Sequence, residues 1–534
     1  MPKRSQIVEI YAPVAGLKYD APSTLIDLRA MPDGSGGKLY YGLNQKEFGT
    51  SLYSTATLGT PVTGLFDAKF SAQSVLQVLT DTGVYRHSSS ADTFVVDGQA
   101  FSGTYTDVWQ GIMYNDAFLY TNGEDPLQVK PDYASTGTDM ASALSPTTYN
   151  AYALAGFREH LCLYHTIENG SEHAQRVRWT KKGTLTYSAG TTDFDSGTAG
   201  AIDLVEALGE IKIAIPLGIT LAIYCESCIF IQTWVGGDET FRFIKTVNGI
   251  GTPSRRGAVS HGDVNYFISR NSFYAYYGGD DYRDIGYSVR DKAFREINQE
   301  ALAASFVEFD EQDQEVLFHV PVGTATTPNK VWVYSIPNQA WTCHDRSFAS
   351  YGTSTRFDAT TIGDLIGTIG EQTLAFGDYY LSEGSVTALY GMPDGRVVKK
   401  DKTVHSIVVN GVTTGQAYSY VTPDIVGFTT KGGKVTDPVD QDETNFTAWI
   451  KRYTKFTYEA TGDGLSSAYY SDDKGSTWTE FKASPVTLSP AGSTHELDMD
   501  RDSRQMRYMV TCTGTNSPIA ISYAKINLIP QGTV

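Results

Sequence analysis

A pattern that recurs along the chain constrains the fold more than any other feature of the sequence. It consists of an apolar strand, a polar turn and an aromatic strand, and its copies begin at Ser74, Asp116, His160, Leu221, Asp263 and Glu315, with a further candidate at Ser385. The first six starts fall roughly 40 to 60 residues apart, which is the period of β-propeller blades. One hairpin cannot bury its apolar face alone, so the pattern predicts neighbouring hairpins stacked around a ring.

Composition supports an all-β chain. The 534 residues include 34 Tyr, 24 Phe and 51 Gly, and only 19% are charged, which suits short strands joined by glycine turns. This length exceeds one ordinary core and predicts two or three domains. We therefore expect a β-propeller with a C-terminal antiparallel β-sandwich-like domain and a β-rich N-terminal arm.

The domain boundaries follow from shifts in this pattern. Residues 1–60 are turn-rich and lack the hairpin pattern, so we expect an arm or platform segment there. Residues 61–428 contain the repeats and form the expected propeller. Residues 429–445, "TTKGGKVTDPVDQDETN" with its polar and glycine-rich composition, are expected to be a linker. Residues 446–534 again alternate apolar and polar residues and predict the sandwich.

Few segments favour helix. In "SVRDKAFREIN", Ser288 can cap a helix whose Val289, Ala293, Phe294 and Ile297 share one face, and residues 199–208 are a second short candidate. The longest apolar stretch, residues 213–231, is interrupted by Pro216 and Gly218 and rich in β-branched residues. It predicts two buried strands with a turn at Glu226–Ser227 rather than a membrane span. The N-terminus has no apolar run of the kind a signal peptide needs.

One motif raises the question of glycan chemistry. The segment "YYSDDKGSTWTEF" contains the Asp-box spacing of sialidases and other propeller proteins, formed by Ser471, Asp473, Gly475, Thr477 and Trp478. Asp473 can accept hydrogen bonds from its own turn, Gly475 can take a positive φ, and Trp478 can pack under the loop. These roles are structural, and the chain has one good copy of the box. We expect a well-made hairpin turn.

No arrangement of nucleophile, base and acid marks a catalytic site, so we expect a protein that is not an enzyme. The nine histidines are scattered; His165 and His173 flank a loop, where isolated histidines are usually structural. Asp498, Asp500 and Asp502 alternate as in a calcium loop, but Ser503 stands where an EF-hand has glycine, and the twelfth position of the loop is not a glutamate. Calcium between Asp498 and Asp502 stays an alternative to a solvated turn.

The cysteines and an arginine pair offer the remaining candidates. The five cysteines, an odd and sparse set, form no disulfide framework, and Cys225-x-x-Cys228 would need two further ligands to hold zinc. We expect reduced cysteines and no cofactor or metal. Arg255 and Arg256 can bind a phosphate or a carboxylate, and we expect them to make a structural, subunit or partner contact.

Four motifs in fixed order carry a family resemblance: "IGTPSRR" (250–256), "YFISRNSFYAY" (266–276), "VRDKAFREIN" (289–298) and "NQAWT" (338–342). With the residues around them, roughly 150–350, they resemble the β-propeller tail-nozzle or tail-hub proteins of short-tailed bacteriophages, whose relatives include packaged-DNA stabilisation proteins. The C-terminal "SAYYSDDKGSTW" also fits that family, and the N-terminal third fits it loosely.

The resemblance implies a structural protein of the virion, assembled in the host cytoplasm. It implies a ring, expected to be a hexamer, below the portal and its adaptor, with tail fibres or spikes as further partners. Such a ring would retain packaged DNA and then provide the channel for its ejection. The formal net charge of −18 fits a lumen that DNA passes without binding, because like charges repel. The alternatives are a glycan-binding or glycan-cleaving propeller of sialidase type, or a tail-tip component of a long-tailed phage.

Overall fold

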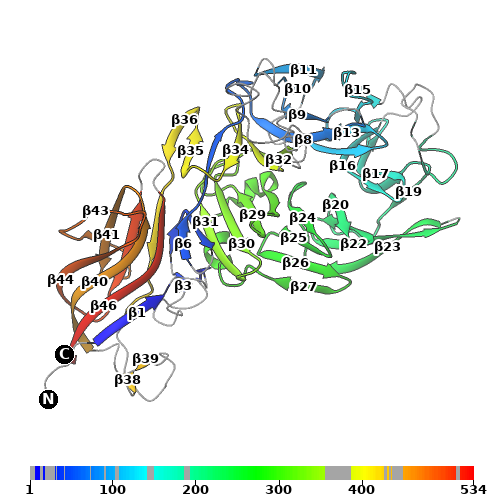
Figure 1. Ribbon diagram of the computed structural model, residues 1–534. Coiled ribbons are helices and arrows are strands. Elements are labelled where there is room, and N and C mark those ends of the chain that lie inside the picture. The colour runs from blue at the N-terminus through cyan, green and yellow to red at the C-terminus, as the bar shows by residue number, and fades with distance from the viewer. Residues whose placement is uncertain are drawn as a thin grey trace, which may run out of the picture.

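The computed structural model shows an all-β protein with a propeller and a second β unit (Figure 1). It describes residues 6–11, 16–18, 30–31, 33–40, 43–71, 74–88, 92–102, 108–140, 149–183, 185, 193–237, 239–354, 386–425, 430–431, 434–435, 449–512 and 518–533.

Seven four-stranded antiparallel sheets, counted over these described residues, form the blades of the propeller. Blade 1 contains β8 (Val62–Lys69), β9 (Ser74–Thr80), β10 (Gly83–Ser88) and β11 (Thr93–Ala100). Blade 2 contains β12 (Gln110–Tyr114), β13 (Ala117–Thr121), β14 (Gln128–Lys130) and β15 (Thr138–Asp139). Blade 3 contains β16 (Tyr149–Phe157), β17 (His160–Glu168), β18 (Ser171–Trp179) and β19 (Gly200–Asp203).

The remaining blades repeat this order. Blade 4 contains β20 (Ile211–Leu217), β21 (Thr220–Cys225), β22 (Cys228–Gly236) and β23 (Glu239–Asn248). Blade 5 contains β24 (Ala258–His261), β25 (Val264–Ile268), β26 (Phe273–Gly278) and β27 (Asp281–Asp284). Blade 6 contains β28 (Phe306–Asp310), β29 (Glu315–Val320), β30 (Lys330–Ser335) and β31 (Ala340–His344). Blade 7 contains β32 (Ser350–Ser354), β33 (Thr387–Gly391), β34 (Val397–Asp401) and β7 (Gly49–Leu52).

The expected propeller is confirmed, and the recurring hairpins of the sequence supply the two middle strands of each blade. Blade 7 closes the ring in a way the repeat pattern does not reveal. Its outermost strand, β7, comes from the segment we expected to be an arm, and it pairs with β34 through Leu52 opposite Val398. The innermost strand of this blade, β32, then lies beside β8, where the Ser350 hydroxyl donates to the Val62 carbonyl at 2.6 Å.

The second unit consists of two six-stranded sheets, drawn at the left of Figure 1, where β1 is blue and β46 is red. One sheet contains β44 (Ser493–Ser503), β40 (Trp449–Gly462), β46 (Ile519–Thr533), β6 (Leu43–Lys46), β5 (Gly37–Tyr40) and β1 (Gln6–Tyr11). The other contains β4 (Gly34–Ser35), β37 (Tyr418–Val421), β45 (Arg507–Cys512), β41 (Leu465–Ser471), β42 (Thr479–Glu480) and β43 (Val486–Thr487). Phe456 of the first sheet stacks on Tyr508 of the second at 4.5 Å between ring centroids, so the sheets pack face to face.

Strand pairing divides the chain differently from the boundaries we expected at residues 60 and 428. Within residues 1–60, β1, β4, β5 and β6 belong to the sandwich, while β7 belongs to blade 7. Strand β37 lies before residue 428 but pairs with β45 in the sandwich. Of the expected linker, the short strands β38 (Thr430–Lys431) and β39 (Lys434–Val435) are described, and the rest of 429–445 lies outside the described residues.

Three smaller elements complete the described chain: a parallel pair, β2 (Gly16–Leu17) with β3 (Ala30–Met31), a hairpin, β35 (Ser406–Val409) with β36 (Val412–Gly415), and the 3-10 helix η2 (Gln299–Ala304). The expected helix is present as α1 (Arg290–Glu296), and Val289, Ala293 and Ile297 are buried. Ser288 does not cap it, because the N-cap is Val289 and makes no side-chain capping bond. Among the described residues, no helix has the length and apolar character needed to cross a membrane.

Two further expectations for secondary structure are wrong. Residues 200–203 form the edge strand β19, not a helix, because they pair with β18 and Asp203 forms an ion pair with Arg176 at 2.7 Å. Residues 498–503 continue strand β44 and are not a turn. Their carboxylates are held by cations of the neighbouring strand β40: Asp500 pairs with Arg452, and Asp498 pairs with Lys455 at 3.7 Å.

The two units share one apolar core. A single cluster of buried side chains joins blades 5 and 6, through Phe273 and Trp332, to α1, through Ala293, and to the sandwich, through Tyr418 and Phe456. The propeller and the sandwich are therefore packed as one body at this junction.

A buried ion network lies beside this core. Lys38 on β5 contacts Asp313 at 2.6 Å and Glu315 at 3.2 Å, both in blade 6. Lys400 in blade 7 contacts the same Asp313 at 3.0 Å and Asp310 at 2.5 Å. The network thus ties the N-terminal strands to the last two blades.

Candidate functional site at the propeller axis

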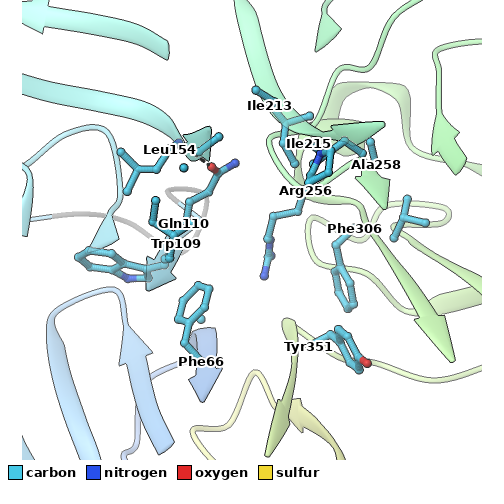
Figure 2. A pocket seen from close by; sticks show the side chains of 18 of the residues that line it. Phe66, Trp109, Gln110, Leu154, Ile213, Ile215, Arg256, Ala258, Phe306 and Tyr351 are labelled. Carbon is cyan, nitrogen blue, oxygen red and sulfur yellow. Dashed lines mark hydrogen bonds between the residues drawn. The ribbon is translucent and has the colours of Figure 1, made fainter. Parts of the chain in front are cut away.

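The propeller axis contains a cavity of about 380 Å³. All seven blades line it through residues of their innermost strands or the segments just before them (Figure 2). Apolar side chains make most of the wall, including Phe66, Trp109, Leu154, Ile215 and Phe306. Propellers and other closed β-rings commonly place ligand sites at such central openings, so this cavity is the candidate site.

Arg256 extends from the segment before blade 5 into this cavity (Figure 2). Its Nη1 donates to the Thr63 carbonyl of blade 1 at 3.2 Å, and its Nη2 donates to the Ala349 carbonyl before blade 7 at 2.9 Å. The guanidinium also lies over the Phe306 ring of blade 6, 5.1 Å from its centroid. Arg256 therefore spans the axis and holds the two blades at which the ring closes.

Burial lowers the pKa of Arg256 to about 10, so its guanidinium remains charged at neutral pH. The charge has no acidic neighbour that contributes to this shift among the described residues. Its Nε is buried and has no hydrogen-bond partner in the described part of the chain.

Arg255 extends to the other side of the axis. Its guanidinium stacks on the Tyr152 ring of blade 3, 3.7 Å from the centroid, and donates to the Asn122 carbonyl of blade 2 at 2.9 Å. We expected a structural, subunit or partner contact for Arg255 and Arg256, and both side chains make structural contacts with other blades of the same chain. One dipeptide therefore braces four blades, two on each side of the axis.

Gln110, which the sequence did not single out, is the second brace. Its Nε2 donates to the Arg255 carbonyl at 2.6 Å, and its Oε1 accepts from the Leu154 amide at 3.2 Å. The one available signal in the sequence is a polar side chain at the start of an apolar strand. Together Gln110 and Arg256 block the axis, so this cavity is a pocket and not a passage for DNA.

A charged cluster lies next to Arg255 on one rim of the propeller. On this rim the innermost strand of each blade begins, and the second strand connects to the third. His165 lies between two carboxylates: its Nε2 is 2.8 Å from Glu172 and its Nδ1 is 3.4 Å from Glu210. The Tyr152 ring that carries Arg255 also packs on the imidazole, at 4.1 Å. His165 has a φ of 50° at a bulge of β17, a conformation that is costly for a residue other than glycine.

This cluster brings one imidazole and two carboxylates within 4.8 Å of one another, but they fit a metal poorly. The carboxylates face different ring nitrogens, whose lone pairs point away from each other, and Lys212 already pairs with Glu210. Burial lowers the pKa of His165, while a hydrogen bond with Glu172 opposes the shift. The group is better described as an imidazole that bridges two carboxylates.

The Asp-box lies far along the chain from this rim, between β41 and β42. Asp473 accepts hydrogen bonds from the Thr477 amide at 2.9 Å and from the Thr477 and Ser471 hydroxyls at 2.7 Å each. Gly475 has a φ of 85° and donates its amide to Ser471 at 2.8 Å, with the Trp478 ring next to it. All of these hydrogen bonds lie within the turn.

The remaining candidates from the sequence are structural in their contacts. All five cysteines are buried and none is in a disulfide. A hydrogen bond between Cys225 and Cys228 lowers the pKa of Cys228 to about 7, and the Leu208 amide donates to the same sulfur. His173 lies on β18, outside the His165 group. The described residues contain no other group of three metal-ligand side chains.

Comparisons with known proteins give no family. No family model and no curated protein matches the sequence. Among solved structures, the extracellular domain of a hybrid two-component system from B. thetaiotaomicron is 9% identical, with a TM-score of 0.35 over 70% of this chain. This chain spans 44% of the length of that domain.

Two further solved structures are similar in part. The Neurospora crassa Pan2 WD40 domain is 8% identical to this chain, with a TM-score of 0.34. The match covers 67% of this chain and 95% of that domain. A family 29 carbohydrate-binding module is 12% identical, with a TM-score of 0.14, over 23% of this chain and 73% of the module. Scores of this size carry no weight for function, and the fold assignment rests on the strand pairing described above.

Proposed function

We propose that this protein is a structural component of a bacteriophage tail, forming a nozzle or hub ring below the portal and adaptor. In this proposal the ring retains packaged DNA and opens a channel when the tail engages its host. The ordered motifs "IGTPSRR", "YFISRNSFYAY", "VRDKAFREIN" and "NQAWT" suggest it. The virion is then its location, and the portal-adaptor, the fibres or spikes, and further copies of this chain are its partners.

The observation that carries the proposal is where these motifs lie. The motif "IGTPSRR" supplies Arg255 and Arg256, which brace the axis. The motif "YFISRNSFYAY" forms the central hairpin of blade 5, and "VRDKAFREIN" forms helix α1. The core shared with the sandwich contains Phe273, Ala293 and Trp341, which come from the last three of the four motifs. The residues that carry the resemblance therefore support a rigid building block, which is what a ring under internal pressure requires.

The closed axis places one condition on this function. Because Gln110 and Arg256 span the axis, DNA cannot run through the propeller of a single chain. In the proposed ring, the channel lies between copies that are related by rotation. The net charge of −18 leads us to expect that acidic side chains face this lumen.

Exposed apolar side chains offer surface for contacts between copies. Five of them lie on blades 4 and 5, at Ile219, Trp234, Val235, Ile244 and Tyr277, with exposed fractions from 38% for Tyr277 to 79% for Ile219. Monomeric proteins rarely leave such groups uncovered over a continuous area. We assign this surface to a second copy of the same chain in the ring.

Negative-stain electron microscopy tests the proposal, with the purified chain alone and mixed with the tail proteins of its own virion. Sixfold rings with a central hole, or added density at the distal end of a short tail, are the expected result. Monomers that do not bind the tail would contradict it, as would a ring whose lumen is lined mainly by Lys and Arg. Turnover or binding of a sialoside or polysaccharide in a glycan panel would favour the alternative of a glycan-active propeller instead.

A further inference from the structure

The guanidinium of Arg256 is charged and partly buried in the cavity, and no carboxylate of the described residues pairs with it. It is bonded to two backbone carbonyls, which are dipoles and not anions. A buried cation without a counter-charge is costly, and proteins usually pair it. Arg256 does not form an ion pair with any carboxylate of the described chain.

Unused hydrogen-bonding groups lie on Arg256 itself and on two segments that are linked to it. The buried Nε of Arg256 has no acceptor, although a guanidinium carries five N–H donors. The hydroxyls of Thr63 and Ser305 are also buried and without a partner in the described part of the chain. Both residues belong to segments bonded to Arg256: Thr63 through its carbonyl, and Ser305 through Ser254, whose hydroxyl also accepts from the Arg256 amide.

The walls of the cavity decide which anion would fit. Phe66, Trp109, Leu154, Ile215 and Phe306 provide apolar surface around the charged group (Figure 2). A phosphate dianion would lose much hydration there, whereas one carboxylate on an apolar body would match both the guanidinium and the walls. The volume of about 380 Å³ lies near the lower end of small-molecule pockets, which favours a small ligand.

We propose that the axial cavity is a binding site for a small monocarboxylate with an apolar body, held by Arg256. The carboxylate belongs either to a free organic acid or to a side chain or C-terminus of a partner, and it would accept from the second N–H groups of Nη1 and Nη2, each of which makes one bond to a backbone carbonyl. This site is independent of the proposed ring, because a single chain provides all of its described residues.

Isothermal titration calorimetry on the full chain tests the site, with octanoate as the probe. Octanol has the same apolar body without the charge, and octylammonium has the opposite charge. We expect octanoate to bind with 1:1 stoichiometry and at least about tenfold more tightly than octanol, and octylammonium not to bind. Equal affinity for octanoate and octanol, or no binding of octanoate at millimolar concentration, would overturn the proposal.

Three variants locate the binding. Arg256→Gln should reduce the affinity for octanoate to that for octanol. This change also weakens a brace of the propeller, so Ile215→Trp provides a second test. Ile215 is half-buried, lines the cavity and makes no described bond to Arg256. The larger tryptophan ring should fill the space that the ligand would occupy. Arg255→Gln, the matched control, should leave the affinity within about twofold. Octanoate binding that survives Ile215→Trp would place the ligand elsewhere and refute the axial site.

A competition experiment distinguishes the two sources of the carboxylate. The chain saturated with octanoate is mixed with the tail proteins of its virion. If a partner inserts a carboxylate, octanoate should weaken the complex, and if the ligand is a free acid, the complex should be unchanged while octanoate stays bound.

Discussion

Arg256 donates a hydrogen bond from Nη1 to the carbonyl oxygen of Thr63, 193 residues away in the chain, at 3.2 Å. Thr63 is the second residue of β8, the innermost strand of blade 1, and Arg256 precedes the innermost strand of blade 5, so the bond crosses the propeller. The Nη2 of the same side chain donates to the carbonyl oxygen of Ala349, just before blade 7. One side chain thus holds the junction where the first and last blades meet, opposite its own blade.

Arg256→Lys should destabilise the protein by about 1–2 kcal/mol, because a lysine keeps the buried charge but cannot hold two separate carbonyls with a fixed fork of donors. Urea unfolding followed by tryptophan fluorescence measures the change. Arg255→Lys is the matched control: Arg255 donates to a carbonyl of blade 2 and stacks on Tyr152 of blade 3, away from the junction of blades 1 and 7, so its loss should be smaller. An equal loss in both variants would contradict the special role of the crossing bond.

Local sequence pattern was sufficient for the elements whose partners are near in the chain. The hairpin of blade 5 and helix α1 follow from alternation and helical spacing over fewer than about twenty residues. Strand β19 shows the limit of this reasoning. Its residues resemble a helix, but pairing with β18 and the Arg176–Asp203 ion pair decide for strand.

Contacts between distant segments could not be predicted from the pattern. Leu52 pairs with Val398, and Arg256 with Thr63, and no local signal connects either pair. The arginine pair was visible as a candidate, but its partners are backbone carbonyls, which every residue possesses. The roles of Gln110 and Tyr152 were not predicted for the same reason, because both residues act through contacts with other blades of the closed ring.

Gly49→Ala should open the seventh blade. A Cβ at Gly49 would lie 1.9 Å from the backbone oxygen of Ser406, so strand β7 would have to move away from its place beside β34. We expect a loss of about 2 kcal/mol or more in urea unfolding, with faster hydrogen exchange along β34. Gly156→Ala is the control, since its Cβ would meet Tyr114 at an ordinary 3.4 Å. Unchanged exchange along β34 in Gly49→Ala would refute the closure by β7.

Glu315 should make stability fall as pH rises through neutrality. Burial raises its pKa to about 7, against the attraction of Lys38. A carboxyl whose folded pKa is raised stabilises the fold while protonated, so its contribution is complete below about pH 4.5 and is lost above about 7. We expect a decrease of about 1–3 kcal/mol in the free energy of unfolding between pH 5 and 8 from this residue.

The measurement is the difference between the native chain and Glu315→Gln in urea unfolding at several pH values. The difference is needed because burial also lowers the pKa of His344 to about 3, and a buried neutral histidine acts in the opposite direction below its ordinary pKa. Glu311→Gln, an exposed neighbour, is the control. If Glu315→Gln and the native chain change in parallel from pH 5 to 8, the titrating group lies elsewhere.

Glu47, a buried carboxylate that is attracted by Lys38 and Lys400 of the same ion network, should stay ionised in acid. Burial would raise the pKa of Glu47, but Lys38 and Lys400 outweigh it and hold that pKa near 2. Since the folded pKa is depressed, the contribution of Glu47 is present above the ordinary carboxyl range and is lost only as pH falls toward 2. Glu47→Gln should therefore destabilise the protein at pH 6 and lose most of this effect by pH 2.5. A penalty that does not depend on pH would argue against ionised Glu47 in the network.

Asp473→Ala separates the two interpretations of the Asp-box. The Thr477 hydroxyl and amide, which bond to Asp473, hold the pKa of that carboxyl near 2, so the turn keeps its bonds at any pH well above that value. Removing the carboxyl should speed hydrogen exchange at the Thr477 amide and leave octanoate binding and ring formation unchanged. Lys474→Ala, in the same exposed turn, is the control for a change of surface charge. If the native chain cleaves a sialoside and Asp473→Ala does not, the box is part of a catalytic site, and the structural interpretation of this turn fails.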